Sequence, residues 1–353
     1  MSDVLSQTIA NIRPLSETAM AKAKERQDIL TKPTGSLGRL EELSIQIAGI
    51  QEKPMPQITQ KAVIVIAADH GVAVQGISAY PQEVTSQMVL NFLHGGAGIN
   101  VISRQVGARV IIVDMGVSGR LGSNTGLVSR KIAAGTQDMS KGPAMTLAQA
   151  KKTLEVGIEI VTAEFQKGLD IVATGDMGIG NTTASSAICA VMIGKTVAEV
   201  TGRSTGLDDR QLQHKIAIIN KAVAVNRPDA SKPMEVLAKV GGFEIGGLAG
   251  VILGAASHRV PIVIDGFISG AAALVAAGLC PRVKDYLIAG HCSVEPGHKL
   301  LLKYLGLRPL LDLEMRLGEG TGAALGISIA ETSVRILAEM ATFSEAGVSD
   351  KGE

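Results

Sequence analysis

The chain contains 353 residues with a formal net charge of +1, and 46% of its residues are hydrophobic although only 2% are aromatic. This charge balance offers no electrostatic attraction to nucleic acid or to an anionic membrane, so we expect neither as a partner. Three widely spaced cysteines, and a start that does not resemble a signal peptide, favour a cytoplasmic protein without disulfides.

Residues 1–60 predict helices and no strand, and residues 36–51 carry Leu37, Leu40, Leu43 and Ile47 at helical spacing. Further along, short apolar runs rich in β-branched residues lack polar alternation; they span residues 62–68, 110–113, 171–173, 261–264 and 286–289. Such runs are typical of strands buried on both faces of a parallel sheet. Helical patterns at residues 146–167 and 208–226 lie between them, and this alternation predicts a doubly wound, mainly parallel α/β sheet with helices on both faces.

The longest apolar region, residues 260–279, contains Pro261 and Asp265. A carboxylate at the centre of a membrane span costs about 2.5–3.5 kcal/mol, so we predict no span here. Residues 321–340 predict a long final helix, and the tail after Phe343 is expected to be loose. A chain of this length exceeds the size of one typical core. We therefore predict a large Rossmann-like domain of residues 61–310, with residues 1–60 and 311–353 contributing to a smaller helical domain.

Polar residues follow the predicted strands, at the sheet edge where ligands bind in doubly wound folds. The glycine-rich segment 175–183 joins a strand to an apolar helix and combines free backbone N–H groups with a helix N-terminus, as an anion site requires. A tight turn without a ligand is an equal alternative. Residues 201–206 and the turn at Ser293 offer similar loops. Lys215 lies one or two turns into the helix that follows residues 201–206, and it is a candidate phosphate ligand. On base rates, a lysine on a helix is more often exposed to solvent.

A single carboxylate, Glu319, stands between Gly318 and Gly320. Glycine on both sides allows the backbone to approach a ligand closely. Taken alone, such a segment is more often a polar turn than a site.

Tyr80, Gln87 and Met88 belong to a segment that enters a helix, and they are candidates to wall a flat apolar ligand. Simple packing at a helix start is the alternative. His70, His291 and His298 are candidate metal ligands, but neither an HExxH nor a CxxC spacing is present. The sequence also lacks a GxSxG nucleophile elbow.

Several ordered motifs together resemble those of the nicotinate-nucleotide–dimethylbenzimidazole phosphoribosyltransferases, and the resemblance extends over nearly the whole chain. The motifs are KPTGSLGRL at residues 32–40, ADHGV at 68–72, GIGNTT at 178–183, TGRSTG at 201–206, Ser293 with EPGH at 295–298, and LGEGTG at 317–322. One position departs from the family pattern, which often reads Gly-Glu-Met-Gly-Ile-Gly where this chain has Asp176 as the acid.

The resemblance implies transfer of phosphoribose from nicotinate mononucleotide to 5,6-dimethylbenzimidazole, which gives α-ribazole 5′-phosphate and nicotinate for the cobalamin nucleotide loop. It implies a homodimer without metal or cofactor, Glu319 as the general base and Asp176 as a candidate second carboxylate. The positions that match phosphate and ribose contacts are Gly178, Lys215, Gly266 and Ser293. Those that match the base pocket are Tyr80, Gln87, Met88 and Leu317.

Two other classes compete with this interpretation, namely a metal-dependent hydrolase that uses the histidines and a nucleotide-binding protein without catalysis. The sequence leaves open which base is preferred, where the dimer interface lies, whether Asp176 replaces the usual glutamate, and in which direction the pKa of Glu319 is shifted.

Overall fold

The computed structural model describes residues 3–122, 124–204 and 206–349. Its strands are β1 (Lys61–Ala68), β2 (Arg109–Gly116), β3 (Leu127–Ser129), β4 (Ile171–Met177), β5 (Ile262–Ile264) and β6 (Leu287–Ala289). Within the described residues they form one sheet in the order β3-β2-β1-β4-β5-β6, and every pairing is parallel. The predicted strands and the α/β class are therefore confirmed, and β3 is an edge strand that the sequence did not predict.

The helices lie before, between and after these strands. Before β1 are α1 (Val4–Asn11), α2 (Glu17–Ile29) and α3 (Arg39–Gln51); between β1 and β4 are η1 (Gly71–Gln75), α4 (Val84–Leu93), α5 (Gly98–Val106) and α6 (Leu147–Gln166). Between β4 and β6 are α7 (Asn181–Ile193), α8 (Val197–Val200), α9 (Asp209–Asn226), α10 (Pro233–Val240), α11 (Phe243–Ser257), α12 (Phe267–Leu279) and η2 (Pro281–Tyr286). After β6 are α13 (Pro296–Leu305), α14 (Thr321–Glu339) and α15 (Phe343–Ala346). The four helices predicted from periodicity are α3, α6, α9 and α14, and all four are confirmed.

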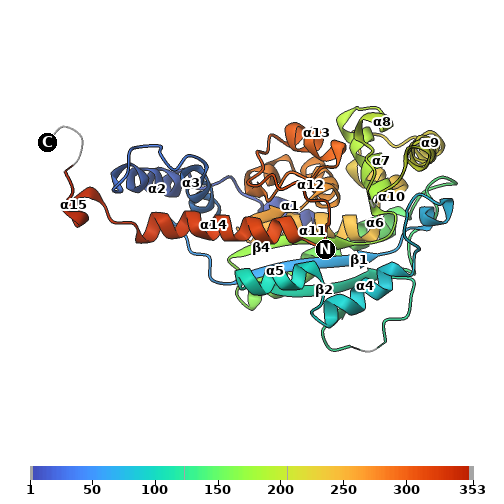
Figure 1. The fold of residues 1–353 in the computed structure, drawn as a ribbon, viewed down its shortest axis with the longest axis horizontal. Coiled ribbons are helices and arrows are strands. Elements are labelled where there is room, and N and C mark those ends of the chain that lie inside the picture. The colour runs from blue at the N-terminus through green and yellow to red at the C-terminus, as the bar shows by residue number, and fades with distance from the viewer. Residues whose placement is uncertain (1–2, 123, 205, 350–353) are drawn as a thin grey trace.

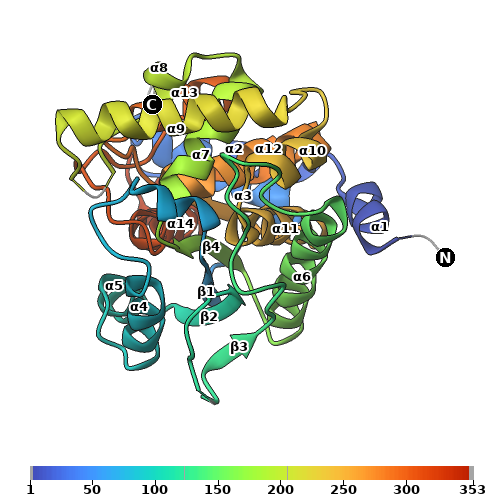
Figure 2. The ribbon, with the colours of Figure 1, turned by 90° about the vertical axis from the view of Figure 1, so that its right-hand side faces the viewer.

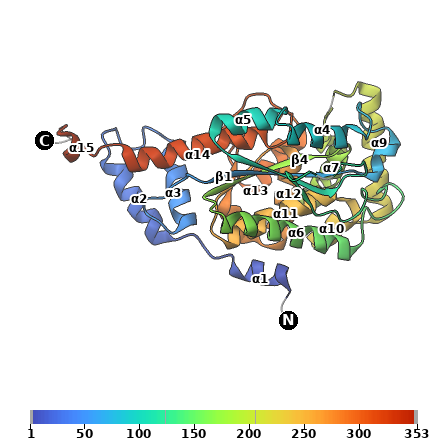
Figure 3. The same cartoon turned by 90° about the horizontal axis from the view of Figure 1, so that it is seen from below.

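Both faces of the sheet are buried, as the apolar runs predicted. Successive side chains of a strand point to opposite faces. Val63 and Val65 of β1 join the core beneath α4, α5 and α14, whereas Ile64 and Ile66 join the core beneath α6, α11 and α12. Figure 3 shows α4 and α5 on one side of the sheet and α6 and α11 on the other, and Figure 2 shows the same layers from the end.

The parallel register places the carboxyl ends of neighbouring strands together. Ala67 of β1 lies opposite Asp114 of β2 and Met177 of β4. The chain then leaves the sheet at this edge through the loops that precede η1, α7, α12 and α13. A ligand that binds beyond the strand ends therefore meets several of these loops at once.

Beyond the sheet, α2 and α3 lie beside the C-terminal half of α14 (Figure 1). Arg26 donates to the carbonyl of Leu337, and the N–H of Thr31 donates to the carbonyl of Ala341. α1 instead packs against α6 and α11. We keep the smaller helical domain as a proposal, which these contacts support for α2, α3 and α14.

The expectation of a loose tail after Phe343 is wrong for residues 343–346, which form a helix, and residues 350–353 lie outside the described residues. This helix is α15, and the Thr342 side chain accepts the N–H of Glu345 in a capping box. Such a cap satisfies N–H groups that the first turn of a helix leaves free.

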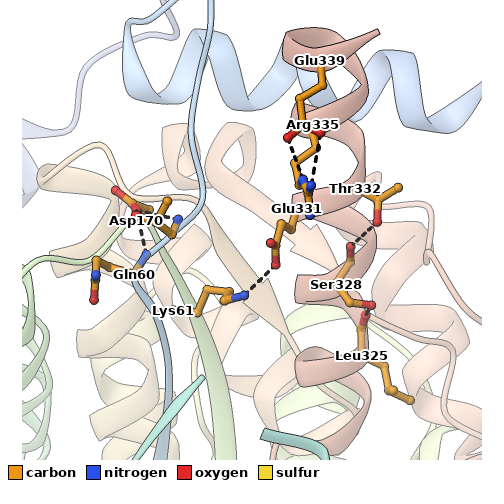
Figure 4. Close-up of polar contacts among 10 residues, drawn as sticks. Gln60, Lys61, Asp170, Leu325, Ser328, Glu331, Thr332, Arg335 and Glu339 are labelled. Atoms are coloured by element: carbon orange, nitrogen blue, oxygen red, sulfur yellow. Dashed lines mark hydrogen bonds and ion pairs between the residues drawn. The ribbon is translucent and has the colours of Figure 1, made fainter. Parts of the chain in front are cut away.

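Polar contacts attach α14 to the start of the sheet. Lys61, the first residue of β1, forms an ion pair with Glu331 of α14, with 2.6 Å between Nζ and Oε2 (Figure 4). Nearby, a carboxylate oxygen of Asp170 accepts the N–H of Gln60. The ion pair thus joins α14 to the start of β1, and the hydrogen bond joins the start of β1 to the residue before β4. Within the part of the chain that the structure describes, no helix combines the length and hydropathy of a membrane span.

Candidate active site

Glu319 lies in a turn of left-handed backbone at the start of α14. Gly318, Glu319 and Gly320 have φ values of +82°, +62° and +92°. Glycine adopts this region freely, but a residue with a Cβ atom pays about 1–2 kcal/mol. The side chain of Glu319 is nevertheless buried, with an exposed fraction of 5%. Strain of this kind persists only where the surroundings hold the residue in place, and it is common at functional sites.

Strand β4 supports this turn through a glycine. A Cβ atom at Gly175 would lie 2.3 Å from the carbonyl oxygen of Glu319, so the turn rests directly on the strand backbone. Any larger residue at 175 would displace the turn. The glycine that precedes Asp176 therefore has a packing function.

The carboxylate of Glu319 lies at the N-terminus of a different helix from its own. Its Oε2 accepts the N–H of Ile99 in α5 at 3.1 Å. Burial raises the pKa of Glu319 above its ordinary value, the charge of Asp265 adds to this, and the hydrogen bond from Ile99 opposes it. The sequence did not predict the contact with Ile99, although the glycine-rich segment 95–98 was a possible signal.

Asp176, at the end of β4, lies beside the same turn. A Cβ atom at Gly318 would be 3.4 Å from its Oδ2, which also accepts the side-chain N–H of Asn181 at 2.9 Å. Its Oδ1 is buried and has no hydrogen-bond partner within the described residues. Burial, with the charges of Asp265, Glu244 and Glu319, raises the pKa of Asp176 well above its ordinary value.

A cavity of about 330 Å³ opens at these strand ends. Six of the predicted site residues line it, namely Tyr80, Asp176, Gly178, Gly266, Ser293 and Leu317. The other lining residues are Met177, Ile179, Asn181, Thr182, Ser204, Phe267, Ile268, His291, Glu295, Arg316 and Gly318. Residue 205 of the 201–206 motif lies outside the described residues.

Lys215 lies behind the wall of this cavity. Its side chain is fully buried, and Nζ donates to Oγ1 of Thr182 at 2.8 Å. Burial lowers the pKa of Lys215 to about 8, although the charge of Glu295 opposes the shift. The alternative of a solvated helix lysine is therefore wrong. Burial of this face of α9 could not be predicted from residue spacing alone.

Gln87 and Met88 lie on α4, away from the lining. Gln87 is exposed, and Met88 is half-buried against the core beneath α4, α5 and α14. Neither side chain is among those that line the cavity in the described chain.

The histidines considered as metal ligands have other partners. Nε2 of His70 lies 2.8 Å from Oε1 of Glu244, and although burial alone would lower its pKa, the charge of Glu244 and this hydrogen bond raise it. Nδ1 of His298 accepts the N–H of Ser293, and burial lowers the pKa of His298 to about 3. His291 lies 3.6 Å from Asp265. Across residues 3–122, 124–204 and 206–349, no group of three His, Cys, Asp or Glu is placed to hold a metal ion.

Comparison with known proteins matches this chain to one family over nearly its full length. The phosphoribosyltransferase family profile matches residues 12–348. The nicotinate-nucleotide–dimethylbenzimidazole phosphoribosyltransferase of Desulforudis audaxviator (strain MP104C) is 62% identical over 98% of both chains. The chain belongs to this phosphoribosyltransferase family. The enzyme of the same name from Roseiflexus sp. (strain RS-1) is 61% identical over 99% of both chains.

Solved structures agree with the family assignment. The crystal structure of CobT from Thermus thermophilus has a TM-score of 0.91 and 46% sequence identity, and the match covers 94% of this chain and 99% of that one. A second structure, of the nicotinate-nucleotide–dimethylbenzimidazole phosphoribosyltransferase from the same organism, has a TM-score of 0.90 and 45% identity over 95% of this chain and all of that one. The fold predicted from the sequence is therefore that of the family.

Proposed function

We propose that this phosphoribosyltransferase transfers phosphoribose from nicotinate mononucleotide to 5,6-dimethylbenzimidazole, and that it releases nicotinate and α-ribazole 5′-phosphate for cobalamin nucleotide-loop assembly. The observation that carries the proposal is the full-length similarity to relatives with this printed activity, at 62% identity for one of them. The cavity supports it independently: glycine turns, apolar side chains and the buried carboxylates of Asp176 and Glu295 line it, and Glu319 lies just behind the lining residue Gly318.

The chemistry needs one base and no acid. Displacement at a ribose anomeric carbon passes through an oxocarbenium-like state. Nicotinate leaves from a positively charged ring nitrogen and is neutral at that atom afterwards, so it requires no proton donor. The benzimidazole must lose its N–H proton as its other nitrogen attacks. A single general base completes the reaction.

Glu319 is the residue that we propose as this base. Its carboxylate is held by the N–H of Ile99, and its left-handed backbone is fixed against β4. The raised pKa increases its basicity, and a catalytic group is most effective when its pKa lies near the working pH. With both substrates held at near-attack distance, positioning can supply about 7–11 kcal/mol in favourable cases.

The phosphate of the nucleotide is proposed to bind at the turn before α7. Gly178 lies in this turn, where a Cβ atom would meet the carbonyl oxygen of Ala68 at 2.2 Å. The turn therefore packs on β1, and its residues Gly178, Ile179 and Asn181 line the cavity at the N-terminus of α7, where an anion is favoured. Lys215 supplies positive charge through Thr182, and Gly266 and Ser293 line the opposite side.

Tyr80 and Leu317 are proposed to hold the benzimidazole. Their exposed fractions are 54% and 59%, although both line the cavity. A flat aromatic ligand between them would bury this apolar surface. We also propose Gln87 and Met88 as contacts of the benzimidazole, because they match base-pocket positions of the family. Since both lie on α4 outside the cavity lining, a bound base must extend beyond the cavity to touch them.

Asp176 is proposed to take the place of the second carboxylate of the family. It lines the cavity beside Gly318 despite its shorter side chain. Its unpartnered Oδ1 and raised pKa suit a protonated carboxyl that donates a hydrogen bond to a bound ligand.

The test is to incubate the protein with nicotinate mononucleotide and 5,6-dimethylbenzimidazole and to measure released nicotinate by chromatography. We expect release that requires the benzimidazole and an equal amount of ribazole phosphate. Release without the benzimidazole would indicate hydrolysis, and binding without release would indicate a nucleotide-binding protein. Parallel reactions with purines and phenols would establish the preferred base.

The homodimer and the cytoplasmic location are also proposals. The three cysteines, which are all buried and free, support a reducing compartment. Light scattering at several protein concentrations tests the dimer.

A further inference from the structure

Asp265 is a buried carboxylate that the phosphoribosyl transfer described above does not use. It follows β5 directly and is fully buried. Its Oδ2 accepts the N–H of Gly320 at 3.2 Å, and its Oδ1 accepts the N–H of Ala323 at 3.0 Å. Both donors belong to the turn and first helical residues that immediately follow Glu319.

These hydrogen bonds replace the cap that α14 lacks in its own sequence. Its N-cap residue is Gly320, which has no side chain to accept the free N–H groups. Asp265 supplies the acceptors from a neighbouring strand. A carboxylate at a helix N-terminus also interacts favourably with the helix dipole.

His291 holds Asp265 from the other side. Its Nε2 lies 3.6 Å from Oδ1 of Asp265, and a Cβ atom at Gly322 would lie 2.0 Å from its Cδ2. The ring therefore packs against the first turn of α14. Strand ends β5 and β6 together fix the position of the helix that carries the base.

We propose that Asp265 is a positioning residue for Glu319: by accepting the N–H groups of Gly320 and Ala323, it fixes the left-handed turn that carries the base. This inference rests on the proposed function, because it assigns Asp265 a role through the base of that reaction.

Electrostatic effects at the turn follow from the groups around it. Asp265 after β5 acts on Glu319 itself, and Asp176 from β4 lies beside Gly318. Behind them, His291 after β6 acts on Asp265, and Glu244 from α11 acts on Asp176. Burial raises the pKa of Glu319 first, and the negative charge of Asp265 raises it further. Burial also raises the pKa of Asp265, and the charge of His291 opposes this. Where Asp265 is ionised, removing its charge is expected to lower the pKa of Glu319, so that the ionised base persists to lower pH.

The experiment compares Asp265→Asn with wild type. The amide keeps one acceptor oxygen but loses the charge and the second acceptor. We expect kcat to fall on the order of 100-fold, since a misplacement of about 1 Å has an effect of this size. KM for nicotinate mononucleotide changes little, and the acid limb of the kcat/KM profile moves to lower pH. In apo protein, amide exchange at Gly320 and Ala323 becomes faster.

The matched control is Asp114→Asn. Asp114 is likewise a buried aspartate at a strand end, and its carboxylate accepts the N–H of Val117 at 2.8 Å. It lies outside the cavity lining. A similar loss of thermal stability in both variants, with loss of kcat in Asp265→Asn alone, separates positioning from general destabilisation.

Two results would overturn the inference: kcat unchanged in Asp265→Asn, or a loss of kcat with the acid limb in its wild-type position. If Asp265→Asn does not fold, Asp265→Glu retains the charge and acceptors but displaces them, and should lower kcat without moving the acid limb. If neither Asp265→Asn nor Asp265→Glu folds while Asp114→Asn does, Asp265 is needed for folding itself, and the proposal that it only positions Glu319 is overturned. Absence of turnover in wild type would instead overturn the proposed function, and the amide exchange result would still stand.

Discussion

Replacement of Glu319 by glutamine tests whether one carboxylate carries the proton transfer. Glutamine has the same size, and its side-chain oxygen can still accept the N–H of Ile99, which lies 3.1 Å from Oε2 in the wild type. The turn and the cavity should therefore remain. Loss of a general base typically lowers a rate by about 10²–10⁴-fold, which corresponds to about 3–5 kcal/mol of transition-state stabilisation. We expect kcat to fall within this range while the Kd for 5,6-dimethylbenzimidazole stays near its wild-type value.

The assay is single-turnover release of nicotinate, with benzimidazole affinity measured separately by calorimetry. Glu314→Gln is the matched control. Glu314 is an exposed glutamate in the loop that precedes α14, and it also has a left-handed backbone, with φ of +54°. Its kcat should equal that of wild type. A Glu319→Gln variant with undiminished turnover would remove Glu319 from the mechanism, and a variant that loses benzimidazole affinity in proportion to turnover would assign it to binding.

Four further predictions follow from the packing and the charges of the site. Gly175→Ala should lower kcat with little change in nucleotide affinity, because its Cβ atom would lie 2.3 Å from the carbonyl oxygen of Glu319; unchanged kinetics would show that the turn tolerates displacement. Asp176→Asn should raise the melting temperature at pH 7 but not near pH 3.8. Burial and neighbouring charges raise the pKa of Asp176 well above 3.8 in the folded protein, so the wild type loses stability as the pH rises from 3.8 through the folded-state pKa. Lys215→Met should raise the Kd for nicotinate mononucleotide by about 10–100-fold, the equivalent of one charged hydrogen bond, and calorimetry would show whether it does. Dialysis against a chelator should leave nicotinate release unchanged, and a loss that zinc restores would support the hydrolase class instead.

Strands and helices of this fold could be predicted because the signals are local. β1 is apolar from residue 62 to its end and β4 begins with the apolar run 171–173, and α6 and α9 begin after residues whose side chains cap the helix. Edge strand β3 was missed because it has only two apolar residues, Leu127 and Val128, before Ser129, whereas β5 and β6 are equally short but wholly apolar.

The site was predictable only in part, because burial and long-range contacts are not local properties. Lys215 lies on an amphipathic helix, and the sequence alone does not show that the face carrying it is fully covered. The contact between Glu319 and Ile99 joins residues 220 positions apart. In the sequence, the glycines on either side of Glu319 are equally consistent with an ordinary turn. Only the structure shows that this turn packs directly on the backbone of Gly175.

The grouping of acids around the turn fits the charge of the proposed substrate. Asp176, Asp265, Glu244 and Glu319 are all buried, and the charges of the other three raise the pKa of Asp176. Their mutual repulsion favours a protonated Asp176, and those of the other carboxylates that stay ionised create a negative potential, which is costly in the empty site. Nicotinate mononucleotide brings a positively charged ring nitrogen, and the oxocarbenium-like state concentrates positive charge on the ribose. The same potential therefore stabilises the substrate and the transition state, whereas released nicotinate no longer has the ring charge that binds it.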